Sequence, residues 1–222
     1  MLRVILFDLD GTLMDTAPEI ADALNATLAR LGQAPADEAL VRSWIGDGAR
    51  ALLGKALAHA GLPASAVEWS WDGFAREYQQ RVGTKSRVHE GVHEMLQRLR
   101  RQGLHLVLLT NKEASFAHRL LTLNGMLADF DLVVAGDTLP VKKPHPGVVT
   151  HALAALDAEP HEALLVGDSI TDVRTARAAG VAVWLVRHGY PQGELAGDDA
   201  PDGFIEHFDN FHPVAADRVA IG

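Results

Sequence analysis

Two aspartates near the start of the chain have a spacing that suggests chemistry. Asp8 and Asp10 follow the apolar run Val4-Ile5-Leu6-Phe7 and precede Gly11. Residues two apart in an extended chain point the same way, so both carboxylates are expected on one side of the backbone. Such a pair is costly unless a cation lies between the two groups. Asp-Gly is also a common turn, so the pair alone is equally consistent with a turn and with a reactive site.

A second acidic segment, Gly167-Asp168-Ser169-Ile170-Thr171-Asp172, follows an expected strand and opens an expected helix. Ser169 and Asp172 have the spacing of a helix capping box. Capping does not account for Asp168, which adds an acid at the end of the strand. Asp168 is therefore a candidate metal ligand, and the capping box can coexist with that role.

Candidate phosphate ligands occur in two further segments. Thr110 and Asn111 end another apolar run, and Thr110 with Glu113 could form a capping box. A strand-to-helix turn with free N–H groups is also a suitable seat for a phosphate. Lys142 and Lys143 precede a proline, which is typical of a solvated loop. A lysine at the edge of a sheet could instead neutralise a phosphoryl oxygen.

Apolar runs and amphipathic segments alternate along most of the chain. A run that is apolar on both faces suits a buried parallel strand. The alternation predicts an α/β fold with a Rossmann-like parallel sheet and helices on both faces. Ligands of such sheets bind at the carboxyl ends of the strands, where the polar residues above occur. The expected strands are 4–7, 104–109, 131–135, 163–166 and 181–186, and the expected helices are 90–101, 114–123, 148–156 and 170–179.

Residues 15–87 interrupt this alternation. They show helical patterns and no strand signal, which indicates an inserted α-helical domain between the first strand and the rest of the sheet. The expected division is a core of 1–14 and 88–222 with a helical insert of 15–87. The segment 203–222 is weakly patterned. The expected helices of the insert are 18–31, 37–45, 49–60 and 65–82.

Composition limits the class of protein. The formal net charge of −9 argues against a nucleic-acid partner, which would require a basic face. The chain has no cysteine, so a disulfide framework or a thiolate zinc site is excluded. Residues 1–7 are too short for the apolar region of a signal peptide, and no run approaches the roughly 20 residues that span a bilayer. We expect a cytoplasmic protein with no membrane partner, and the sequence leaves the oligomeric state unknown.

Taken together and in order, four segments resemble the motifs of the haloacid dehalogenase superfamily. They are Asp8-Leu9-Asp10-Gly11-Thr12, Thr110-Asn111, Lys143-Pro144 and Gly167-Asp168-Ser169-x-x-Asp172. The position of the insert is similar to the small helical cap of one subfamily. Within it the chain is most similar to phosphoglycolate phosphatases. The supporting residues are Trp44-Ile45-Gly46-Asp47-Gly48-Ala49, Lys143-Pro144-His145-Pro146 and Ala176-x-x-Ala179-Gly180.

The resemblance implies a Mg²⁺-dependent phosphomonoester hydrolase that forms an aspartyl phosphate. Asp8 is then the nucleophile and Asp10 the general acid and base. Lys143 offsets the negative charge, and it is preferred to Lys142 because it directly precedes Pro144. The implied substrate is a small phosphorylated metabolite, in the first place 2-phosphoglycolate.

The same resemblance implies the binding residues. Mg²⁺, which prefers oxygen ligands, would be held by the carboxylates of Asp8 and Asp168 and by the backbone carbonyl of Asp10. Asp172 would lie beyond the direct ligands and orient Lys143 or a metal-bound water. The Thr110 hydroxyl and the Asn111 backbone N–H would bind phosphoryl oxygens.

Other activities stay open at this point. A dehalogenase shares the fold but does not need Asp10 or Mg²⁺. A β-phosphoglucomutase carries a histidine after the first motif, and residues 12–31 contain none. Pyrophosphatase, N-acetylmuramate 6-phosphate phosphatase and sugar-phosphate phosphatase share the core motifs. A non-catalytic binding module on the same fold is a further alternative, which the intact motif set disfavours.

A few residues outside the motifs could also line the cleft. His145 and His188 are candidates because each lies beside a motif or a strand end. Arg50, at the start of an expected helix, could meet a substrate carboxylate. Trp69 and Trp71 are expected to pack inside the insert.

Overall fold

The expected parallel sheet is present in the computed structural model of the chain, which describes residues 1–190 and 195–213. Six strands are ordered β5-β4-β1-β6-β7-β8, and every neighbouring pair is parallel. Their bounds are β1 Val4–Phe7, β4 His105–Leu109, β5 Leu132–Val134, β6 Ala163–Gly167, β7 Ala182–Val186 and β8 Gly203–Ile205. The five strands expected from the sequence are therefore confirmed.

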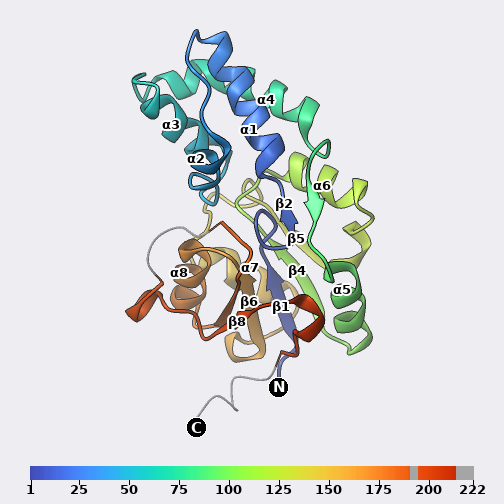
Figure 1. The fold of residues 1–222 in the computed structure, drawn as a ribbon. Coiled ribbons are helices and arrows are strands. Elements are labelled where there is room, and N and C mark those ends of the chain that lie inside the picture. Colours follow the sequence, from blue (N-terminus) through green and yellow to red (C-terminus); the bar gives the residue numbers. More distant parts are fainter. Residues whose placement is uncertain (191–194, 214–222) are drawn as a thin grey trace.

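The central strand β1 is buried on both faces, which explains its uninterrupted apolar sequence. Ile5 and Phe7 face one hydrophobic cluster, whereas Val4 and Leu6 face the other. Helices α5 and α6 cover the first cluster, and helices α7 and α8 cover the second (Figure 1). Their bounds are α5 Val92–Arg101, α6 Ala114–Leu123, α7 Gly147–Ala155 and α8 Ile170–Ala179.

The segment after β7 contributes more structure than its weak pattern indicates. β8 adds a sixth strand, and a short 3-10 helix, Phe208–Asn210, follows it. Phe208 and Phe211 are buried in the core, and the Arg98 guanidinium donates to both of their carbonyls at 3.0 Å. A strand of three residues is too short to show a periodic pattern. Residues 214–222 lie outside the described part of the chain.

The insert consists of four helices, as expected. The first turn of α1 lies nearest the sheet, and the helix packs along α4 (Figure 1). The whole insert lies at the opposite end of the molecule from the N-terminus. The longest described helix has 16 residues, so none in residues 1–190 and 195–213 has the length and apolar composition that a bilayer crossing requires. The bounds are α1 Ala17–Arg30, α2 Glu38–Arg42, α3 Ala49–His59 and α4 Ala66–Arg81.

The expectation that residues 15–87 contain no strand is corrected at the junction between sheet and insert, where a short strand lies at each edge of this segment. β2 (Met14–Asp15) and β3 (Arg87–Val88) form an antiparallel pair. Two-residue strands show no periodicity, so the sequence gives no signal for them. Glu19 also supports the returning chain. Its buried Oε2 accepts N–H bonds of 2.9–3.2 Å from Gly83, Lys85 and Ser86.

Candidate active site

Three aspartates meet at the carboxyl end of the sheet. Asp8 directly follows β1, and Asp168 directly follows β6, its hydrogen-bonded neighbour. Asp172 comes from the first turn of α8. Their carboxylates lie within 4.8 Å of one another, and all three residues are buried. The close approach also requires Gly11, because a Cβ there would lie 2.2 Å from Asp168 Oδ2.

In the described part of the chain, Lys143 is the only basic residue whose side chain contacts this cluster. Its Nζ lies 3.0 Å from Asp8 Oδ1 and 2.7 Å from Asp172 Oδ1. Burial opposes its charge, but the two carboxylates outweigh burial and raise the pKa of Lys143 above its usual value. Lys142 lies elsewhere, 3.6 Å from Glu113. The cluster therefore contains one fixed positive charge.

Both oxygens of Asp172 already have partners. Oδ1 pairs with Lys143, and Oδ2 accepts bonds from the N–H of Asp168 at 3.2 Å and from the N–H and hydroxyl of Ser169 at 3.1 and 2.8 Å. The expected capping box at the start of α8 is present. Asp172 thus holds the lysine and the Asp168 loop in place.

The chemistry of the cluster fits a divalent cation. Asp8 Oδ1 is buried and makes no hydrogen bond of normal geometry within the described residues. Burial raises the pKa of Asp8 to about 6, against the opposing effect of Lys143. Burial, with the charges of Asp172 and Asp8, also raises the pKa of Asp168. Carboxylates that resist ionisation without a counter-charge are suited to a hard divalent metal.

Asp10 lies on the side of the site that faces the insert. Its Oδ1 accepts from the Thr16 hydroxyl at 2.6 Å, and the Lys112 ammonium donates to both carboxylate oxygens at 2.8 and 3.0 Å. Lys112 is buried, and its Nζ lies 4.9 Å from the ring centroid of Tyr78 in α4. Sequence reasoning missed Lys112, because a lysine next to a glutamate is normally solvent-exposed. Its position directly after Thr110-Asn111 was the available signal.

Thr110 and Asn111 are buried at the end of β4. The Asn111 side chain accepts from the Lys143 N–H at 2.9 Å and donates to the carbonyls of Lys143 at 3.0 Å and Gly46 at 2.9 Å. It therefore joins the lysine loop to the insert. The alternative of a capping box between Thr110 and Glu113 is not borne out, because α6 begins at Ala114 with no side-chain cap from Glu113. The Ala114 N–H instead binds Asp137 Oδ1 at 2.8 Å, which satisfies the helix end.

A cavity lies between these residues and the insert. The core supplies polar groups to one wall, and the insert supplies an almost wholly apolar wall. Gly48, with a φ of 90°, lets the loop approach closely, since a Cβ there would lie 3.0 Å from the Asn111 carbonyl oxygen. The lining residues are Asp8, Asp10, Thr110, Asn111, Lys112 and Glu113 of the core and Ile20, Ile45, Gly46, Gly48, Ala49, Leu52, Phe74 and Tyr78 of the insert.

Some residues named in the sequence analysis lie away from this cavity. The Arg50 guanidinium stacks over Trp71 at 4.3 Å and lies 3.4 Å from Glu68 on the surface. Arg50 is thus not placed to meet a substrate in this structure, since a nearby carboxylate and indole hold it outside. Trp69 is 58% exposed, so the expectation that it packs inside the insert is wrong. Trp71 does pack against Phe74, with ring centroids 6.0 Å apart.

The two histidine candidates also lie outside the cavity lining. His145 is exposed, and its Nδ1 accepts from the Gly147 N–H at 3.0 Å, so it shapes its own turn. His188 lies beside the loop after β1, where its Nε2 is 3.0 Å from the Thr12 carbonyl oxygen. Its ring lies against that of His89 in a tilted arrangement, with centroids 3.9 Å apart. Both histidines therefore have structural partners at the edge of the site.

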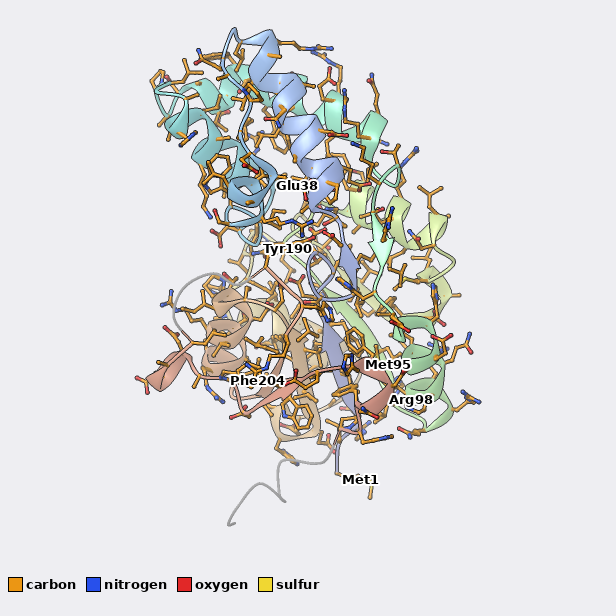
Figure 2. The ribbon with its side chains drawn as sticks, viewed as in Figure 1. Met1, Glu38, Met95, Arg98, Tyr190 and Phe204 are labelled. Atoms are coloured by element: carbon orange, nitrogen blue, oxygen red, sulfur yellow. The ribbon has the colours of Figure 1, made fainter. Side chains whose placement is uncertain are left out.

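Tyr190 connects the acidic cluster with the junction of the insert (Figure 2). Its N–H donates to Asp168 Oδ2 at 2.7 Å, and its hydroxyl donates to Asp15 Oδ1 at 2.5 Å. The same hydroxyl accepts from the N–H groups of Thr16 at 2.8 Å and Ala17 at 3.0 Å. One buried residue thus contacts a candidate metal ligand through its backbone and the start of the insert through its side chain.

Comparison with known proteins gives a consistent result. The family model of haloacid dehalogenase-like hydrolases matches residues 5–186. The chain is 40% identical over 195 residues to a phosphoglycolate phosphatase of Nitrosospira multiformis, which covers 86% of each chain. It is 37% identical over 207 residues to one of Nitrosococcus oceani, with 92% of each covered. A crystal structure of a predicted phosphoglycolate phosphatase from Haemophilus somnus has a TM-score of 0.88 at 31% identity, covering 93% of this chain and 95% of that one.

Proposed function

The chain belongs to the haloacid dehalogenase-like hydrolase family, and from this premise we propose that it is a Mg²⁺-dependent phosphatase of 2-phosphoglycolate. Residues 1–14 and 88–222 form the catalytic core in this proposal, and residues 15–87 act as its cap. The observation that carries the proposal is the presence of Asp8 and Asp10 in one cavity, each with a buried lysine as its partner.

The acidic cluster would hold the metal. Asp8 and Asp168 would supply carboxylate oxygens, and Asp10 would supply its backbone carbonyl. Both oxygens of Asp172 are engaged by Lys143 and by the Ser169 loop, which supports its role in orienting Lys143. When bound, Mg²⁺ would neutralise charge on the phosphoryl group.

Asp8 attacks phosphorus in the first step. A bond forms between an Asp8 carboxylate oxygen and phosphorus, and the bond from phosphorus to the glycolate oxygen breaks. Lys143, 3.0 Å from Asp8 Oδ1, limits the repulsion between the attacking carboxylate and the phosphate. The Thr110 hydroxyl and the Asn111 backbone N–H bind phosphoryl oxygens. The product of this step is an aspartyl phosphate.

Asp10 carries the proton in both steps. In its protonated form it gives the proton to the departing glycolate oxygen, and it is left as a carboxylate. It then takes a proton from the water that attacks the aspartyl phosphate, which breaks the bond from phosphorus to Asp8. Phosphate leaves and both aspartates return to their starting forms. A dehalogenase has no use for this second acid, so the contacts of Asp10 favour phosphate chemistry.

The cavity supports a small leaving group. The cavity is narrow, with about 30 Å³ open to the centres of water-sized molecules. A two-carbon group such as glycolate requires less rearrangement of the insert than a hexose does. This size and the activity in the names of the relatives together favour phosphoglycolate over sugar phosphates, which stand as the second candidate.

The test is a panel of phosphate monoesters scored by kcat/KM with Mg²⁺ and with EDTA. The panel contains 2-phosphoglycolate, glucose 6-phosphate, N-acetylmuramate 6-phosphate, pyrophosphate and p-nitrophenyl phosphate. We expect Mg²⁺-dependent release of phosphate, with phosphoglycolate ranked first. A ranking of phosphoglycolate far below the sugar phosphates would overturn the proposed substrate, but the proposed mechanism would stand. Release of phosphate from none of the compounds would overturn the phosphatase itself.

A further inference from the structure

We propose that Lys112 and Tyr78 form the binding site for the carboxylate of the substrate, and that Lys112 thereby selects carboxylate-bearing phosphate esters. This inference rests on the proposed function and assigns the group that reads the leaving group. It gives a catalytic-site role to a core residue and to a residue of helix α4, neither of which belongs to the phosphoryl-binding cluster.

Charge is the first support for this assignment. Of the described residues that line the cavity, Lys112 is the only one with a positively charged side chain. Lys143 contacts the acidic cluster behind the cavity and is committed to Asp8 and Asp172. Arg50, the earlier candidate, lies on the surface with Glu68. Among the described lining residues, Lys112 is therefore the cation that a substrate carboxylate meets.

Hydrogen-bonding capacity is the second support. An ammonium has three N–H donors, and the described acceptors of Lys112 Nζ are the two oxygens of Asp10. At least one donor thus stays available for a ligand while the contact with Asp10 is kept. The Tyr78 hydroxyl is buried and makes no hydrogen bond of normal geometry among the described residues, with the Lys112 ammonium as its polar neighbour. Buried polar groups without partners are uncommon, and a hydroxyl that lines a cavity is suited to a ligand.

The connectivity of phosphoglycolate is the third support. Its carboxylate is separated from the ester oxygen by one methylene group. Asp10 must reach that ester oxygen to protonate it, so the carboxylate has to lie close to Asp10. Lys112 Nζ is within 3.0 Å of both Asp10 oxygens and 4.9 Å from the centroid of the Tyr78 ring. Both proposed donors therefore lie close to Asp10, as the connectivity of the substrate requires.

Selection follows because a phosphate ester without a carboxylate cannot form hydrogen bonds with these donors. An ester without a carboxylate would bury the free donors of Lys112 and Tyr78 with no acceptor. A site with unpaired buried polar groups discriminates strongly against the analogue that lacks the matching group. The insert wall is apolar at the other lining positions with large side chains, so it offers no compensating contact.

The experiment compares 2-phosphoglycolate with 2-hydroxyethyl phosphate, which has an alcohol in place of the carboxylate. The quantity measured is the ratio of their kcat/KM values, with Mg²⁺ present. In Lys112→Met we expect this ratio to fall roughly 10- to 100-fold, because a hydrogen bond to a charged group is lost. In Tyr78→Phe, which keeps the ring, we expect a smaller fall of about 2- to 10-fold.

A matched control is Lys142→Met, which removes the same charge from the neighbouring loop. Lys142 Nζ lies 3.6 Å from Glu113 and does not line the cavity, so the ratio should stay at the wild-type value. Lys112→Gln supplies a second reading if Lys112→Met does not fold, because the amide can still donate to Asp10. Circular dichroism and thermal melting establish folding for each variant.

The outcomes separate the two proposals. An equal loss on both substrates in the Lys112 variants would mean that Lys112 serves Asp10 alone, which overturns carboxylate recognition and leaves the phosphatase function intact. A wild-type enzyme that hydrolyses both compounds equally well would overturn phosphoglycolate as the substrate and carboxylate recognition with it. A fall in the ratio at Lys112 and Tyr78, but not at Lys142, supports the assignment.

Discussion

The two walls of the cavity differ in both chemistry and origin. The core wall carries buried charge at the ends of β1 and β4, where backbone hydrogen bonds of the sheet hold each residue. The insert wall presents Ile20, Ile45, Leu52 and Phe74, which pack in one hydrophobic cluster. The polar wall can stabilise charge in a reaction, whereas the apolar wall can exclude water and limit size.

Under the proposed function, this contrast assigns the steps of the reaction and the choice of substrate to different parts of the molecule. The proposed phosphoryl chemistry depends on residues next to the strands, and substitutions there should act on kcat. The insert should act on KM and on the range of accepted leaving groups. Lys112 is the point at which the two meet, because it follows β4 and contacts both Asp10 and Tyr78. The predictions below test the contrast, from the largest effect to the smallest.

The largest effect is expected for Asp8→Asn. An amide is a poor nucleophile, so kcat should fall by at least about 10³-fold on every substrate. Thermal melting should show an intact fold, since the change removes a buried charge that the metal-free protein tolerates poorly. Retention of a tenth of the wild-type kcat, in enzyme free of deamidated protein, would exclude Asp8 as the nucleophile.

Asp10→Asn should have the second largest effect, and the size should depend on the leaving group. General acid catalysis contributes roughly 10²- to 10⁴-fold when the leaving group is a poor one, as the glycolate alkoxide is. p-Nitrophenolate leaves without a proton, so its release should fall much less. Steady-state kinetics on both substrates give the comparison. Equal losses would contradict the acid role of Asp10.

Binding of Mg²⁺ should weaken at acidic pH. Burial raises the pKa of Asp8 to about 6, so between the usual value near 3.8 and about 6 the folded protein holds a proton that the unfolded chain has released. This contribution to the stability of the metal-free protein is present at low pH and is lost as the pH rises through about 6. The metal requires the ionised carboxylate, so through Asp8 its apparent affinity should fall progressively below pH 6, approaching about tenfold per pH unit.

Isothermal titration calorimetry with Mg²⁺ at pH 5, 6 and 7 measures this dependence. Asp8→Asn is the control, because it has no carboxyl proton to lose at that position and should show a shallower slope. An affinity for Mg²⁺ that is the same at all three pH values would show that Asp8 is already ionised in the free protein.

The smallest effect is expected on the insert wall. Leu52→Ala enlarges the cavity and should raise KM several-fold while kcat stays close to the wild-type value. Leu57→Ala is the matched control, because Leu57 is buried in the same helix but does not line the cavity. Both changes should cost roughly 2–5 kcal/mol of stability. A loss of kcat in Leu52→Ala alone would break the division between the two walls.

Much of the core wall could be predicted because its signals are local. The apolar run 4–7 predicts a buried strand, and the aspartates follow it directly. The capping box of Ser169 and Asp172 is likewise contained within four residues of sequence. Parallel strands bring their carboxyl ends to one edge, which makes separate motifs into neighbours.

The remainder depends on contacts that no local pattern encodes. Lys112 and Glu19 are charged residues, and a sequence pattern assigns such residues to the surface. Their burial results from packing against distant segments, Tyr78 in one case and the chain at Gly83 in the other. Arg50 shows the opposite error. The sequence suggested that it could meet a substrate, whereas in the structure it pairs with Glu68 on the surface. The position of such a charged residue can be identified only once the three-dimensional position of its partner is also known.

The short pair of β2 and β3 has a consequence for how the protein can vary. Met14 and Val88 are paired, so the chain leaves the sheet and returns to it at adjacent positions. Loop-closure entropy rises by only about 0.6 kcal/mol for each doubling of loop length. A change in the length of the segment between these strands therefore leaves the register of β1 with its neighbours unaltered. In physical terms, substrate range can diverge between homologues through that segment while the aspartates keep their positions.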